Sequence, residues 1–114
     1  MAMTNAARQD ASNAIVTGFT WVSVHTGAGG GTTGANEAAG GSYARKQTTF
    51  TPNGSGVNQG STVNIPLPAG TYTEGGLWSA VSGGTFRGSV AFGGSSVIIS
   101  GSNASIDVTP SVTV

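Results

Sequence analysis

Apolar and polar residues alternate along most of the chain after residue 20, at the two-residue period of β-strands. In 62–67, for example, Val63, Ile65 and Leu67 would share one face of a strand. Turn-forming glycine, asparagine and serine residues separate such runs. The pattern predicts strands over 20–26, 43–50, 62–67, 71–80, 86–92, 97–100, 104–108 and 111–114. Short strands at this spacing, with no helical segment between them, predict an all-β fold: an antiparallel β-sandwich, of which a jelly roll is one form.

The first eighteen residues follow a different period. Thr4 can cap a helix, and Ala7, Ala11 and Ala14 then fall at helical spacing on a small, smooth face. A helix this short and polar must dock on other structure to be stable. We therefore predict an N-terminal helical arm over 1–18 and a single β-sandwich domain over 19–114. The long glycine-rich segment 27–41 is expected to be an irregular loop.

The composition allows only a thin core. Of 114 residues, 37% are apolar and 20 are glycine, and many of the apolar residues are alanine. A chain of this length buries about two-thirds of its unfolded surface. Contacts with other copies could supply the missing burial, so we expect a homo-oligomer, with a trimer as the expected form.

The aromatic residues are interpreted as core and not as a sugar-binding platform, because aromatic side chains contribute much of the burial in small domains. Neighbours on a strand point to opposite faces. Trp78 shares its face with Tyr72, and Leu77 shares the opposite face with polar residues. The sequence therefore predicts that Trp78 points inward and that Leu77 points outward or lies at a subunit contact.

Charge and cysteine content exclude several classes of partner. Four basic residues balance four acidic ones, which gives a net charge of zero and no basic stripe for phosphates. Nucleic acid is therefore not an expected partner. There is no cysteine for a disulfide or a thiolate metal site. A membrane-spanning run and a signal peptide are also lacking, so we expect no membrane association and synthesis in the host cytoplasm.

The few residues that could carry chemistry do not form a catalytic set. His25 is the only histidine, too few for a zinc site or a triad, and we expect it to anchor a loop by hydrogen bonds. The glycine motif of 29–34 is not followed by a helix, as a dinucleotide site requires. Glu37 and Glu74 could form a carboxylate pair, but carboxylates that accept backbone N–H groups of a loop, or that pair with Arg45 or Arg87, are favoured. No enzymatic activity, metal or cofactor is expected.

Several short motifs resemble a group of small virion proteins of tailed bacteriophages, labelled as tail-fibre, minor tail or capsid decoration proteins. These motifs are Val22-Ser23-Val24-His25-Thr26, Asn36-Glu37, Gly40-Gly41-Ser42-Tyr43-Ala44-Arg45 and Gly76-Leu77-Trp78-Ser79-Ala80. The resemblance implies a non-enzymatic structural protein of the virion. The expected role is capsid decoration on the capsid exterior, with the major capsid protein as partner. The alternative is a minor tail or tail-fibre component, either structural or binding a host glycan.

Loop 27–41 and the N-terminal helix are the expected docking elements for that partner. Glu37 and Arg45 are the expected anchoring charges, since a desolvated charge pair can fix the register of an interface. The full set of expected interface residues is Gly29, Gly30, Gly31, Asn36, Glu37, Tyr43 and Arg45.

Overall fold

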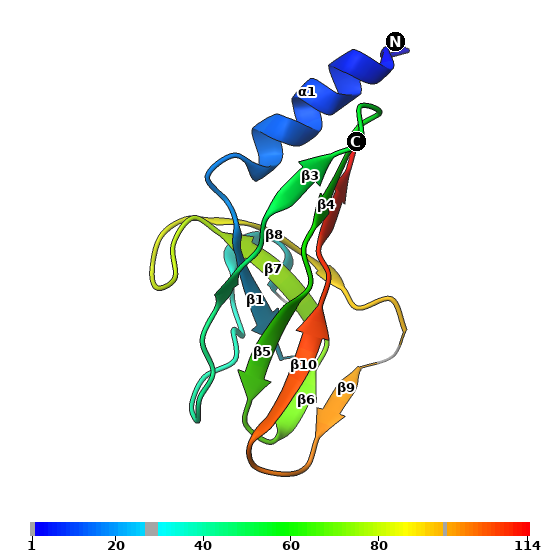
Figure 1. Ribbon diagram of the computed structural model, residues 1–114. Helices are drawn as coiled ribbons and strands as arrows, with labels where there is room; N and C mark the ends of the chain where they lie inside the picture. The colour runs from blue at the N-terminus through cyan, green and yellow to red at the C-terminus, as the bar shows by residue number, and fades with distance from the viewer. Residues whose placement is uncertain (1, 27–29, 95) are drawn as a thin grey trace.

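The computed structural model describes residues 2–26, 30–94 and 96–114. The molecule is elongated, with extents of 47 × 26 × 24 Å, and a helix lies across one end of two β-layers (Figure 1). The helices are α1 (Asn5–Val16) and α2 (Gly30–Thr33). The strands are β1 (Trp21–His25), β2 (Lys46–Gln47), β3 (Phe50–Pro52), β4 (Val57–Gly60), β5 (Val63–Leu67), β6 (Gly70–Tyr72), β7 (Glu74–Trp78), β8 (Phe86–Ala91), β9 (Val97–Ile99), β10 (Ala104–Val108) and β11 (Ser111–Thr113). All described pairings are antiparallel, which confirms the all-β prediction.

The first layer is a four-stranded sheet in the order β2-β1-β7-β8. Val22 lies opposite Leu77 and Val24 opposite Gly75, which places these residues on one face of the sheet. β6 and β9 extend the same hairpin beyond β7 and β8, and the Phe92 N–H donates to the Thr73 carbonyl at the junction.

The second layer is built on one long ribbon. β5 pairs with β10, and the two chain segments then continue as β4 and β11, with β3 at the edge. Val63 pairs with Val108 and Gln59 with Ser111, so the three residues 60–62 on one strand face the two residues 109–110 on the other. The extra residue lies close to Pro110, which lacks the N–H that a regular ladder needs.

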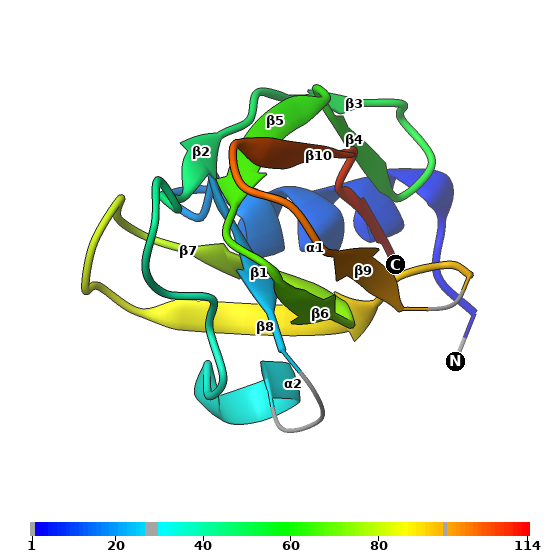
Figure 2. The same cartoon turned by 90° about the horizontal axis from the view of Figure 1, so that it is seen from below.

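The hydrophobic core lies between the layers, where β5 and β10 cover β1, β7 and β8 (Figure 2). The cluster of buried residues consists of Val22, Val24, Ala38, Val63, Ile65, Leu67, Tyr72 and Leu77. The predicted inward face of 62–67 is therefore confirmed. The prediction for Trp78 is wrong, because Leu77 belongs to the core and Trp78 lies half-buried on the opposite face of the sheet. A comparison of neighbouring residues on one strand could not detect that residues 34–45 cover the outer face of the sheet as well.

Helix α1 begins as predicted, with the Thr4 hydroxyl accepting the Ala7 N–H, but it docks through polar residues instead of its alanine face. Gln9 Oε1 accepts the backbone N–H groups of Gly54 and Gly56 in the turn between β3 and β4. Asn58 on β4 donates to Ser12 Oγ at 2.8 Å. Gly56 is required here, because a Cβ would lie 2.9 Å from the Cβ of Arg8.

Three further segments differ from the prediction. Of the strand expected over 43–50, only Lys46–Gln47 and the first residue of β3 are extended. Segment 51–60, which is rich in turn-forming residues and lies outside the strands predicted above, is a β3–β4 hairpin around Asn53 and Gly54. The loop expected over 27–41 contains the short helix α2.

Candidate functional site

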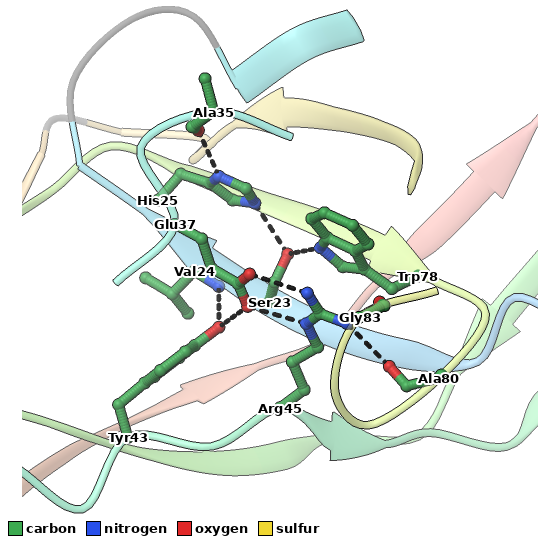
Figure 3. A network of polar contacts seen from close by, with 10 residues as sticks. All are labelled: Ser23, Val24, His25, Ala35, Glu37, Tyr43, Arg45, Trp78, Ala80 and Gly83. Carbon is green, nitrogen blue, oxygen red and sulfur yellow. Dashed lines mark hydrogen bonds and ion pairs between the residues drawn. The ribbon is translucent and has the colours of Figure 1, made fainter. Parts of the chain in front are cut away.

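The outer face of the first layer carries a cluster of polar and aromatic side chains. Residues 34–45, called the strap from here on, run along the free edge of β1 and contribute to this cluster (Figure 3). The strap is attached to β1 by the Thr26 N–H, which donates to the Asn36 carbonyl, and by the Ala38 N–H, which donates to the Val24 carbonyl. It thus replaces a strand at the end of β1 where β2 does not reach.

A directed chain of hydrogen bonds crosses the sheet beneath the strap. The indole N–H of Trp78 donates to Ser23 Oγ at 3.0 Å, and Ser23 Oγ lies 2.7 Å from His25 Nε2. His25 Nδ1 lies 2.8 Å from the carbonyl oxygen of Ala35. Indole can only donate and a carbonyl can only accept, so Nδ1 carries the proton of His25, and the Ser23 hydroxyl donates to Nε2. These bonds confirm the predicted role of His25 as a loop anchor.

Arg45 and Glu37 form an ion pair within the chain. Nε and Nη2 of Arg45 each donate to a different carboxylate oxygen of Glu37 at 2.8 Å, the two-pronged geometry that suits a guanidinium. The side chains are only 6% and 21% exposed, respectively. Burial raises the pKa of Glu37, but hydrogen bonds from Arg45 and Tyr43 outweigh it and hold the pKa below its usual value. Of the alternatives that the sequence left open for Glu37, the structure shows the pairing with Arg45.

Arg45 also fixes the loop between β7 and β8. Its Nη1 donates to the carbonyl oxygens of Ala80 and Gly83 at 2.9 and 2.8 Å. The guanidinium carbon lies 3.7 Å from the centre of the Trp78 ring, a cation–π contact. One side chain therefore joins the strap, the β7–β8 loop and the outer face of the sheet.

Tyr43 completes the edge of β1 where no strand pairs with it. Its hydroxyl accepts the backbone N–H of Val24 at 3.3 Å and donates to Glu37 Oε2 at 2.6 Å. Burial raises the pKa of the Tyr43 hydroxyl, and the hydrogen bond to Glu37 raises it further. The hydroxyl therefore keeps its proton and holds the strap against the sheet.

The cluster does not have the geometry of an active site. Ser23 and His25 look like a nucleophile and its base, but both side chains are fully buried and substrate cannot reach them. Glu74 accepts a hydrogen bond from Ser89. Within the described ranges, no group of three or more His, Cys, Asp and Glu residues is placed to hold a metal ion. No helix in this part of the chain is long and apolar enough to cross a membrane.

The expected interface residues fall into three groups. Glu37, Tyr43 and Arg45 meet in the cluster, where their described partners belong to the same chain. Asn36 contributes its carbonyl to the strap at a φ of 60°, and Gly30 and Gly31 open α2. Gly29 lies outside the described residues. The role of these residues toward a partner stays a prediction.

Sequence reasoning missed Ser23 and Trp78 as members of the cluster. The signal was present, because Ser23 and His25 share one face of 20–26 while Val22 and Val24 share the other. A buried face with this composition must satisfy its polar groups internally.

One comparison with known proteins gives a match. The family model of the Podophage GP4 fiber I protein gp80 matches residues 2–112, nearly the whole chain. No curated protein and no solved structure matches it.

Proposed function

The chain belongs to the family of the Podophage GP4 fiber I protein gp80 and is thus a structural protein of a phage virion, and we propose that it serves as a non-enzymatic component of a tail fibre. The match over residues 2–112 is the observation that carries the proposal. The match favours the tail-fibre alternative. The sequence alone had suggested capsid decoration as the main role.

The internal bonding of the cluster supports a structural role over glycan binding. One face of Trp78 is covered by the Arg45 guanidinium, and the ring also contacts Phe86 at 5.0 Å between centroids. Tyr72 is buried in the core. Sugar-binding platforms need exposed ring faces, and these aromatic side chains instead hold the strap and the layers together.

The position of the chain in the virion tests this proposal. Tailless heads and complete particles of the phage should be purified and probed with an antibody against the chain, and its copy number should be measured against the major capsid protein. A tail-fibre component is expected at low copy number in complete particles and is expected to be absent from tailless heads. Presence on tailless heads in numbers comparable to the major capsid protein would overturn the proposal in favour of capsid decoration.

A further inference from the structure

One side of the two-layered body ends in two unpaired strand edges. Among the described residues, β8 pairs only with β7, and β10 pairs only with β5. An apolar groove of about 540 Å³ lies between β8 and the β10–β11 ribbon, with Val90, Phe92, Val108 and Val112 among its lining residues. Unpaired edges expose backbone donors and acceptors that can pair with a further strand.

Past Arg87 and the register shift opposite Leu77 and Trp78, the β8 edge carries no further charge and no proline to prevent strand addition. Residues 88–92 are Gly, Ser, Val, Ala and Phe, without a charge, a lysine or a proline. Val90 points to the core side of the sheet, opposite Gly75, yet it is 72% exposed. An apolar side chain on the inner face of an edge strand becomes buried once a neighbouring strand is added.

The charges of the two edges are complementary. Arg87 is the only charged residue of β8 and Asp107 is the only one of β10. Both are exposed; the Arg87 guanidinium lies over the Phe19 ring, and Asp107 accepts a hydrogen bond from Asn64. An antiparallel pairing that sets Arg87 of one copy opposite Asp107 of another also sets Ser89 opposite Ser105 and Val90 opposite Ala104. Val90 and Ala104 then both face the core side, and Ser89 and Ser105 both face outward, so the apolar and polar faces of the two strands continue into one another.

We propose that the β8 edge of one copy pairs with the β10 edge of a second copy of this chain, in the register that joins Arg87 to Asp107. Because β8 and the β10–β11 ribbon border the same groove, each copy can use both edges at once. The pairing covers Val90 and removes both unpaired edges, which a single chain leaves open.

A charge exchange tests the pairing on the purified chain, with mass measured by light scattering and native mass spectrometry. The wild type is expected to form an oligomer. Arg87→Glu and Asp107→Arg should each shift the mass to that of the monomer, and the double variant should restore the oligomer. Lys46→Glu and Asp10→Arg make the same charge changes away from the two edges and should leave the mass unchanged.

Two outcomes of this experiment would reject the pairing. One is a wild type that stays monomeric at micromolar concentration, and the other is a double variant that stays monomeric although it melts like the wild type. Since the experiment uses no virions, its failure would leave the tail-fibre proposal standing.

A disulfide test examines the register independently of the charges, because the chain has no cysteine of its own. Directly opposite residues in an antiparallel pair have Cα atoms about 4.5–5.5 Å apart, within the reach of a disulfide. Oxidation of the double variant Ser89→Cys/Ser105→Cys should give covalent oligomers on a non-reducing gel. Covalent dimers of the Ser89→Cys variant alone would instead show β8 pairing with itself and would reject the proposal.

Discussion

Arg45 is the residue on which the outer cluster depends most. Its guanidinium binds a carboxylate on one side, two carbonyl oxygens on the other, and an aromatic ring across its plane. Lysine could not make these contacts together, because an ammonium group is compact and lacks the planar fork. The charge reversal Arg45→Glu, which would test an interface role, would therefore also place two carboxylates in one buried site.

The Glu37 carboxylate should make the stability of the fold sensitive to acid. Its pKa is lower in the folded chain than in the unfolded one, so its contribution is complete above the unfolded value and is lost as the pH falls through the folded value. Glu37→Gln should lower stability near neutral pH by up to about 3 kcal/mol, the low end of the cost of breaking a buried ion pair. Melting temperatures measured across pH should therefore converge for the two proteins in acid.

The control for this measurement is Asp10→Asn, which removes an exposed carboxylate of α1. It should follow the wild type at every pH. If the Glu37→Gln protein kept a constant deficit down to strong acid, the loss would come from packing and not from ionisation.

The hydrogen-bond chain places a proton on His25 Nδ1, which can be observed directly. Nitrogen–proton correlation NMR should show a proton on Nδ1. Ser23→Ala removes the acceptor of the Trp78 N–H and the donor to His25, which should cost about 1–3 kcal/mol because the half-buried indole and the buried imidazole each lose a partner. The exposed Ser102→Ala is the matched control and should melt like the wild type. A proton on Nε2 would contradict the assigned direction of the chain.

At the scale of elements, the strap lies against the sheet only because Gly34 has no side chain. The residue has a φ of +72°, and a Cβ would lie 2.6 Å from Cη2 of Trp78. Gly40 has a φ of +89° but open space around it. Gly40→Ala should therefore cost only the backbone strain, about 1–2 kcal/mol. Gly34→Ala should cost clearly more, since overpacking adds about 1–3 kcal/mol.

Thermal melting of the two alanine variants measures this difference, and the fluorescence of Trp78 should change in Gly34→Ala alone. Equal melting temperatures for both variants would mean that the strap moves aside without cost. In that case the contact of Gly34 with Trp78 does not fix the strap.

The sequence predicted the elements with regular alternation and missed those that depend on distant partners. Segments 62–67 and 104–108 alternate over their whole length, and both are strands, β5 and β10. Segment 57–60 has little apolar content, and it is extended because β3 and β11 pair with both of its edges. Local pattern does not record such pairing.

The candidate site was predictable in its charges and not in its location. The scarcity of other charges left Arg45 and Arg87 as the charged partners expected for Glu37, beside backbone N–H groups, and the role of His25 followed from its position at a strand end. Coverage of the outer sheet face by the strap depends on backbone bonds between Asn36, Ala38 and β1. These bonds carry no side-chain signal, so Trp78 was assigned to the wrong face.

At the scale of the whole molecule, stability should depend little on salt. The net charge is zero, so long-range repulsion is small. Of the described residues, Arg45 and Glu37 form an ion pair, and it is largely buried. Raising the ionic strength from about 0.01 to about 1 M shortens the Debye length from about 30 to about 3 Å and screens exposed charges far more than buried ones. Melting temperatures of dilute protein, below the concentration at which copies associate, should therefore stay nearly constant across this range. A clear fall with added sodium chloride would mean that exposed charges such as Arg8, Asp10 and Lys46 stabilise the chain through contacts beyond its buried pair.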